Sequence, residues 1–281
     1  MLKTFPAKVL LFGEYTILSG SQALAIPFDK FSGKWSYEVR PEKELSQKFL
    51  YDFLLQHNCN HLDIELFKKE LDRGLWFDST IPQGYGLGSS GALVAAIYDQ
   101  FCKTRQDTPE VQKVLGDLEN FFHGSSSGLD PLVSYLQKSF KINNPNEIEI
   151  VDFDFTNLDL FLLNTHRPRQ TGPLVGIYKE KLKDPNFKSG CSNILGEDVN
   201  SAIEYTLRGN KEKLFHHFWH ISKFQWEYFQ EMIPDFMKEA WKKGLDQGEY
   251  ALKLCGAGGG GLILGMTKVE SPLKEFDIIW P

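Results

Sequence analysis

Apolar residues recur along the chain in two spacings, and together they predict a mixture of strands and helices. Short apolar runs bounded by glycine or proline are typical of buried strands, whereas apolar positions three and four residues apart are typical of amphipathic helices. We predict strands at residues 9–12, 23–27, 35–40, 76–81, 148–155, 159–164, 262–266 and 277–280. Helices are predicted at 42–57, at 92–101, from Pro109 to Gly124, and over most of 194–251 with breaks near Gly209 and Pro234.

Strands and helices occur together without an internal repeat or a low-complexity linker, which predicts an α+β protein. A chain of 281 residues has room for two domains of roughly 120–150 residues each. No shift in composition marks a boundary, so we place one near residue 150, after the polar stretch 143–146. The expected domains are residues 1–150 and 151–281.

Composition and charge narrow the class of function. The formal net charge is −6, which argues against a nucleic-acid surface because such a surface needs a basic face. No apolar stretch approaches the length of about 20 residues needed to span a membrane, and no signal peptide is recognisable. The widely spaced cysteines form no C-x-x-C pair, so we expect a reducing, cytoplasmic location; they are Cys59, Cys102, Cys191 and Cys255.

The strongest chemical signal is a glycine-rich run that leads directly into a predicted helix. It reads Pro82-Gln83-Gly84-Tyr85-Gly86-Leu87-Gly88-Ser89-Ser90-Gly91-Ala92. Glycine lets the backbone adopt positive φ and approach a ligand closely, and a helix N-terminus favours an anion. The run therefore predicts a phosphate-binding loop, with one serine available to a metal ion, although a turn capped by serine is the simpler alternative.

Other phosphate-binding motifs fit this run less well. A Walker A motif is absent because no Gly-Lys-Ser/Thr follows the glycines. The spacing Gly86-x-Gly88-x-x-Gly91 satisfies the dinucleotide fingerprint, but Gly256-x-Gly258-x-x-Gly261 satisfies it too, and residues 82–85 separate the first match from its strand. A nicotinamide oxidoreductase is therefore the weaker interpretation.

Two carboxylates and one lysine complete the set of candidate residues. Glu119 and His123 lie four residues apart on one helical face, and the loop after Gly124 leads to Asp130. One carboxylate would hold the metal ion of a nucleotide while the other orients or deprotonates an attacking hydroxyl. Lys8 precedes the first buried strand and could stabilise developing charge. Read alone, Asp130 before Pro131 is more typical of an ordinary turn or N-cap than of a catalytic site.

Three histidines at residues 216–220 also attract attention. His216 and His220 are four residues apart, which is a spacing that can ligate a metal ion. A zincin pattern is absent, however, and aromatic residues lie between and around the histidines. The sequence favours a packing helix here.

In this order, the motifs resemble those of the GHMP kinases, the superfamily of galactokinase, homoserine kinase, mevalonate kinase and phosphomevalonate kinase. The first motif is 8–15, the second is 82–92 with its Gly-Leu-Gly-Ser-Ser centre, and the third is the glycine loop 255–261. Between them, Glu119-x-x-x-His123-Gly124-x-x-Ser127-Gly128-x-Asp130 and Pro168-Arg169-Gln170-Thr171 are similar to mevalonate kinase in particular. The resemblance extends from Lys8 to about Met266.

This resemblance implies a two-domain GHMP-kinase-like fold with the active site in the interdomain cleft, and a magnesium- and ATP-dependent kinase of isoprenoid precursor synthesis. Residues 84–91 would bind the ATP phosphates, Ser90 (or Ser89) and Glu119 the Mg²⁺ ion, and Asp130 with Lys8 would act on the acceptor hydroxyl. The implied acceptor side comprises Glu14, Tyr15, His123, Thr171, Gly258 and Gly259. The partner would be a small molecule, without nucleic acid or membrane, and a homodimer is one option.

The identity of the acceptor stays open at this stage. Mevalonate kinase usually has Gly-Glu-His where this chain has Gly13-Glu14-Tyr15, which is closer to phosphomevalonate kinase. Phosphomevalonate would need an additional basic group, for which the candidates are Arg167, Arg169, Lys179 and Lys181. Mevalonate is the leading acceptor; phosphomevalonate, a sugar, and a nucleotide-binding paralogue without catalysis are the alternatives.

Overall fold

The computed structural model describes residues 3–56, 60–105, 110–144, 147–169, 171–270 and 273–280. The side chains of Gln56, His123 and Thr171 also lie outside this description. Packing divides the chain into two compact units, which interleave in sequence. Unit 1 comprises Met1–Lys8, Pro27–Pro82 and Leu87–Lys138, and unit 2 comprises Val9–Ile26, Gln83–Gly86 and Ser139–Pro281. The boundary predicted near residue 150 stays a prediction.

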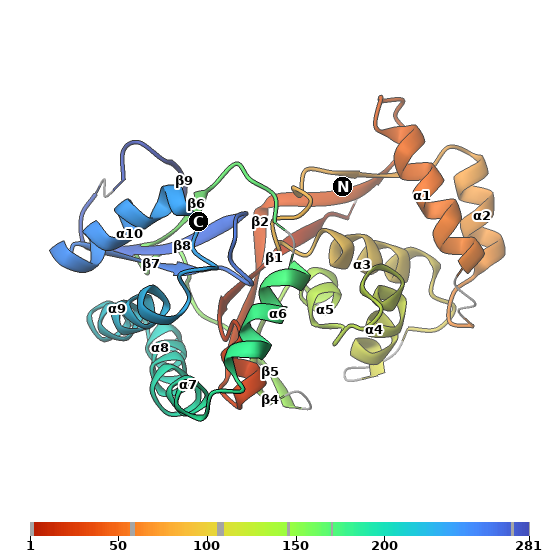
Figure 1. Ribbon diagram of the computed structural model, residues 1–281. Helices are drawn as coiled ribbons and strands as arrows, with labels where there is room; N and C mark the ends of the chain where they lie inside the picture. The colour runs from red at the N-terminus through yellow and green to blue at the C-terminus, as the bar shows by residue number, and fades with distance from the viewer. Residues whose placement is uncertain are drawn as a thin grey trace. The chain divides into compact units, whose positions relative to one another are not determined.

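Unit 1 consists mainly of helices packed beside one strand pair (Figure 1). Strand β3 pairs antiparallel with the last four residues of β2. Trp35 on β2 packs its ring against Phe77, Phe67 and Phe101, and these buried aromatic side chains form the core. The elements are β2 (Ala23–Ser36), α1 (Lys43–Gln56), α2 (Ile64–Asp72), β3 (Trp76–Ser79), α3 (Ser89–Phe101), α4 (Glu110–His123) and α5 (Leu129–Leu136).

Unit 2 contains helices and two groups of paired strands. The start of β2 pairs with β4 (Ser139–Asn144), which pairs with β5 (Glu147–Val151). A second sheet has the order β7-β8-β6-β9 and is antiparallel throughout. Its strands are β6 (Leu160–Asn164), β7 (Tyr250–Leu254), β8 (Leu262–Thr267) and β9 (Asp277–Ile279). Strand β1 (Phe5–Phe12), like β2, contributes residues to both units.

The helices of unit 2 come between β6 and β7 in the chain. They are α6 (Thr171–Lys181), α7 (Pro185–Ser189), the π-helical turn η2 (Gly190–Leu195), α8 (Gly196–Leu207), α9 (Lys211–Tyr228) and α10 (Asp235–Gln247); the short 3-10 helix η1 (Thr16–Ser19) follows β1. The breaks predicted near Gly209 and Pro234 are confirmed, because α8 ends before Gly209 and Pro234 is the N-cap of α10. None of the described helices is long and apolar enough to cross a membrane.

The prediction of an α+β fold is confirmed, but several element boundaries were wrong. The strands predicted at 23–27 and 35–40 are one strand that ends at Ser36. Exposed polar residues in its middle interrupt the apolar pattern but not the backbone. Strand β4 was missed for the same reason, since it holds part of the polar stretch 143–146. Residues 250–251 were predicted as helix, but Gly248 ends α10 with φ +69° and β7 follows.

One further prediction was imprecise, and two helices were missed. The strand predicted at 148–155 ends at Val151. The helices α6 and α7 were not anticipated, because α6 lacks a clear apolar stripe and α7 has only five residues. Pro109, predicted to open a helix, lies outside the described residues, although α4 begins directly after it at Glu110.

Candidate active site

The glycine-rich run adopts the backbone that its composition predicted. Gly84, Gly86 and Gly88 have φ of +75°, +71° and +69°, in the left-handed region that favours glycine. Gly88 is the N-cap of α3, whose first two residues are Ser89 and Ser90. The end of the run is tied to β1, because the backbone N–H of Lys8 donates to the Leu87 carbonyl at 2.9 Å. The positive end of the α3 dipole therefore lies directly after the glycines, where an anion is stabilised.

Two of these glycines allow α3 to approach α5 closely. A Cβ atom on Gly91 would lie 2.9 Å from the Asp130 carbonyl carbon and the Pro131 nitrogen, so a side chain there would strike the α5 backbone. A Cβ atom on Gly88 would lie 3.4 Å from Asp130 Oδ2 and 3.5 Å from Lys8 Cβ. The glycines thus place the N-terminus of α3 beside both candidate catalytic residues of unit 1.

Lys8 and Asp130, which are far apart in sequence, form an ion pair. Lys8 Nζ lies 2.8 Å from Asp130 Oδ1. The lysine side chain is 10% exposed and the aspartate side chain is 34% exposed, so the carboxylate remains accessible while the cation is mostly buried. Asp130 stands in the first turn of α5 after the N-cap Gly128, which has φ +72°. A fixed cation and an accessible carboxylate are suited to a hydroxyl that must lose its proton.

Glu119 is a buried carboxylate held by two serine hydroxyls. Ser90 Oγ donates to its Oε1 at 3.2 Å, and Ser126 Oγ donates to its Oε2. Burial raises the pKa of Glu119 to about 7, and the Asp130 carboxylate adds to this, while the serine hydroxyls and Lys8 oppose it. A cation would relieve the cost of this buried charge, and the oxygen donors Ser90 and Glu119 are of the kind that Mg²⁺ prefers.

The remaining predicted residues with described side chains lie in unit 2, and Glu14 is buried there in an ion pair. Lys253 Nζ lies 2.6 Å from Glu14 Oε1 and also donates to the carbonyls of Leu11 and Leu254, each at 2.8 Å. The backbone N–H of Gly256 donates to the same carboxylate oxygen at 3.4 Å. Burial raises the pKa of Glu14, and Lys253 opposes that rise. Glu14 therefore holds the start of the C-terminal glycine loop against β1.

Tyr15 is also packed inside unit 2. Its hydroxyl donates to the Ala257 carbonyl at 2.7 Å, and its ring lies 4.5 Å from that of Tyr178. Burial raises the pKa of the Tyr15 phenol. The glycine loop that it contacts is tight, because the Gly259 N–H donates to the Met232 carbonyl at 2.6 Å and a Cβ on Gly258 would lie 2.6 Å from that same oxygen.

Arg169 joins two glycine segments of unit 2, a role that sequence reasoning did not anticipate. Its Nη1 donates to the Cys255 carbonyl, and its backbone N–H donates to the Gly84 carbonyl at 2.9 Å. A Cβ atom on Gly86 would lie 1.7 Å from Arg169 Nη2, so only glycine admits the guanidinium there. Among the described residues, its buried Nε has no hydrogen-bond partner.

The structure thus brings Lys8, Gly88, Ser90, Gly91, Glu119 and Asp130 together in unit 1. Ser89 occupies the first position of α3, but the serine bonded to Glu119 is Ser90. His123 ends α4 and Thr171 begins α6, and their side chains lie outside the described residues. A separate pocket of about 490 Å³ in unit 2, beside Phe187, Ile194 and Tyr228, is lined by Lys181, a candidate for the additional basic group, and by no other predicted site residue.

Comparison with known proteins supports the same interpretation. Residues 52–138 match the family model of the GHMP kinases N terminal domain. The mevalonate kinase of Pyrococcus abyssi is 24% identical over 299 residues, which cover 95% of this chain and 88% of that protein. A crystal structure of mevalonate kinase superposes with a TM-score of 0.66 at 17% identity, covering 99% of this chain and 98% of that chain.

The fold is that of the GHMP kinases. Its resemblance to mevalonate kinase, which the motifs indicated, is confirmed by these matches. Solved structures of a galactokinase and a phosphomevalonate kinase share the fold at similar levels. Lactococcus lactis galactokinase complexed with galactose has a TM-score of 0.66 at 17% identity, covering 94% of this chain and 84% of that chain. Streptococcus pneumoniae phosphomevalonate kinase in complex with phosphomevalonate and AMPPNP has a TM-score of 0.62 at 17% identity, covering 98% of this chain and 94% of that chain.

Proposed function

We propose that this protein is an ATP-dependent small-molecule kinase that transfers the γ-phosphate to a primary alcohol, with mevalonate as the acceptor. The observation that carries the proposal is the position of the Lys8–Asp130 pair beside the N-terminus of α3 and its glycine loop. Mevalonate kinases that align with almost the whole chain support this choice of reaction and acceptor. The reaction would belong to isoprenoid precursor synthesis.

The phosphate donor is bound by residues 84–91 and by the first turn of α3. Positive φ at Gly84, Gly86 and Gly88 lets backbone N–H groups face an anion, and the dipole of α3 adds a favourable field. Ser90 and Glu119, which are hydrogen-bonded to each other, would hold the Mg²⁺ ion. When bound, the ion neutralises charge on the transferring phosphates.

Asp130 and Lys8 act on the acceptor. The Asp130 carboxylate accepts the hydroxyl proton as the acceptor oxygen bonds to the γ-phosphorus, and the bond from that phosphorus to the β–γ bridging oxygen breaks to release ADP. Lys8, held 2.8 Å from Asp130, stabilises the negative charge that develops on the acceptor oxygen. Most of the rate enhancement comes from positioning and charge stabilisation, because the phosphoryl group passes through a loose transition state.

The cysteines support a proposal about the cellular setting. No disulfide joins the cysteines in the described part of the chain, and Cys191 is a buried free thiol. This supports a reducing location, the cytoplasm.

The experiment that tests the proposed function is an ADP-release assay with Mg-ATP and, separately, mevalonate, phosphomevalonate, galactose and homoserine. The proposal predicts release with mevalonate and much less with the others. Release only with phosphomevalonate or galactose would reassign the acceptor within the same superfamily. ATP binding without turnover on any acceptor would instead indicate a nucleotide-binding paralogue, and thermal protection by NAD(P) but not by Mg-ATP would overturn the kinase assignment.

A further inference from the structure

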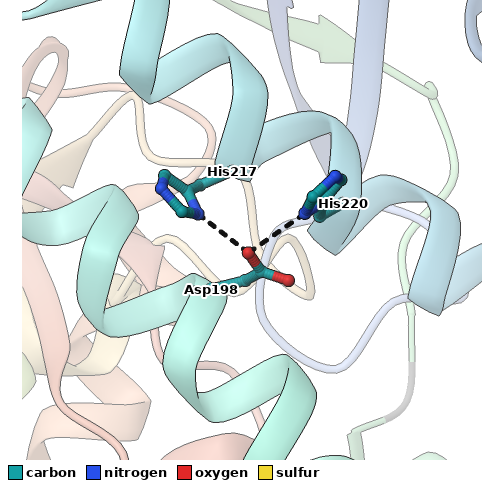
Figure 2. A group of neighbouring side chains, drawn as sticks. All are labelled: Asp198, His217 and His220. Carbon is teal, nitrogen blue, oxygen red and sulfur yellow. Dashed lines mark hydrogen bonds and ion pairs between the residues drawn. The ribbon is translucent and has the colours of Figure 1, made fainter.

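Three potential metal ligands converge on the facing surfaces of α8 and α9. Figure 2 shows His217 and His220 of α9 pointing toward the carboxylate of Asp198 on α8. Asp198 Oδ1 lies 2.8 Å from His217 Nδ1 and 3.3 Å from His220 Nδ1. One ligand atom from each residue lies within 4.8 Å of the other two. All three residues belong to unit 2, outside the proposed kinase site of unit 1.

This pairing differs from the one that the sequence drew attention to. The spacing in sequence singled out His216 and His220, but the two rings that face one acceptor are His217 and His220, three residues apart on the same face of α9. The ring of Tyr205 stacks on that of His217 with centroids 5.5 Å apart and planes 13° apart, which fixes the orientation of the imidazole. The contact between α8 and α9 therefore holds two imidazoles and one carboxylate close together before any metal ion binds.

From this geometry we infer that Asp198, His217 and His220 bind a divalent transition-metal ion, with Zn²⁺ the best fit. Two imidazole nitrogens and one carboxylate oxygen are ligands that Zn²⁺ accepts, with bonds of about 2.0–2.2 Å. Ligands of a tetrahedral ion at such distances are separated by roughly 3.3 Å. The His220–Asp198 separation of 3.3 Å already matches, and the His217–Asp198 separation of 2.8 Å requires only a small opening.

The site is accessible to an ion, and its donors discriminate against magnesium. The side chains of Asp198, His217 and His220 are 15%, 22% and 39% exposed. A solvent molecule can therefore take the fourth position of a tetrahedral ion. Mg²⁺ prefers oxygen donors in octahedral geometry, so millimolar magnesium for the kinase reaction would not fill a site with two imidazoles.

A metal ion here would link α8 to α9 and stabilise the helix that supports the C-terminal glycine loop. Gln225, near the end of α9, accepts a hydrogen bond from the Leu254 N–H at 2.8 Å through its buried Oε1. Leu254 is the last residue of β7, directly before the loop that begins at Cys255. The ion is thus structural and contacts none of the residues proposed for phosphoryl transfer.

The test is a titration of the full-length, metal-stripped protein with Zn²⁺ in buffer containing excess Mg²⁺, followed by calorimetry. We expect one saturable site, and with Co²⁺ in its place the visible absorption of a tetrahedral complex. His217→Asn and Asp198→Asn should each weaken Zn²⁺ binding at least about tenfold, because even mutations of residues that only hydrogen-bond to metal ligands reduce metal affinity by that much. Zn²⁺ should also raise the melting temperature of the native protein but not of these variants.

His216→Asn is the matched control, since His216 is an adjacent histidine on the same helix outside the ligand set. It should bind Zn²⁺ almost as tightly as the native protein. The inference is overturned if no saturable site appears, if His217→Asn binds as tightly as the native protein, or if His216→Asn loses as much affinity as His217→Asn. Far-UV circular dichroism of each variant separates lost ligands from lost folding.

Discussion

Removing the buried cation Lys253 should destabilise the protein more than any change at an exposed lysine. The lysine side chain is fully buried and the Glu14 side chain is 2% exposed, so water cannot replace the lost partner. All three ammonium protons have acceptors: Glu14 Oε1 at 2.6 Å and the carbonyls of Leu11 and Leu254 at 2.8 Å. Lys253→Met would leave one carboxylate and two carbonyls buried without that donor, and breaking a buried pair in this way costs about 3–5 kcal/mol.

The assay is urea unfolding followed by tryptophan fluorescence. With an m value of about 3 kcal/mol/M, a loss of about 3–5 kcal/mol in unfolding free energy lowers the urea concentration at the midpoint by about 1–1.7 M. The matched control is Lys242→Met, because Lys242 pairs with Asp246 at 2.7 Å but is 60% exposed. Exposed pairs of this kind contribute about 0.5 kcal/mol or less.

A double variant separates the ion pair from the packing around it. Glu14→Gln together with Lys253→Met removes both charges, so it should recover about 2 kcal/mol of the loss caused by Lys253→Met alone. If the free energy of unfolding of Lys253→Met lies within about 1 kcal/mol of the native value, the Glu14–Lys253 pair does not stabilise the fold as argued above. The same conclusion holds if the double variant is no more stable than Lys253→Met.

Two further predictions concern unit 1. The folded-state pKa of Glu119, about 7, lies above its ordinary value of 4.5, so the folded protein binds this proton more tightly than the unfolded chain does. The free energy of unfolding without Mg²⁺, measured by urea unfolding, should therefore fall by up to about 3 kcal/mol as the pH rises from 4.5 to 7. Glu119→Gln should remove that decrease. If this variant shows the same dependence of unfolding free energy on pH as the native protein, the decrease does not come from Glu119. Gly91→Ala would push a methyl group into the α5 backbone at Asp130 and Pro131, and should cost about 1–3 kcal/mol in the same assay together with a lower kcat; native stability would contradict the close approach of α3 and α5.

The glycine loop is the part of the site that could be predicted from sequence alone, because backbone conformation is a local property. Three glycines in alternate positions required positive φ, and the apolar run after them required a helix. The structure has both at Gly84–Gly88 and in α3. The pairing of Lys8 with Asp130 rested on family resemblance instead, because no local rule brings together residues that distant in the chain.

The contacts that local rules missed depend on long-range pairing and burial. Lys253 lies inside a buried strand of which only the first two residues had been predicted, as helix, and its charge is compensated by Glu14, which was assigned to the substrate. The guanidinium of Arg169 fits only because Gly86 and Gly256, far apart in sequence, both lack a side chain. Similarly, the histidine pair facing Asp198 is set by how α8 packs on α9.

The most direct test of the proposed function is the effect of Asp130→Asn on turnover and on ATP affinity in the same preparation. If Asp130 accepts the hydroxyl proton, kcat with mevalonate and Mg-ATP should fall by about 10²–10⁴-fold. ATP affinity, measured by calorimetry, should change little, because the phosphates are held by the glycine loop and α3. Asp246→Asn, at an exposed aspartate of unit 2, serves as the control and should keep native turnover. Near-normal kcat in Asp130→Asn would contradict the catalytic role of this residue and with it the mechanism proposed above.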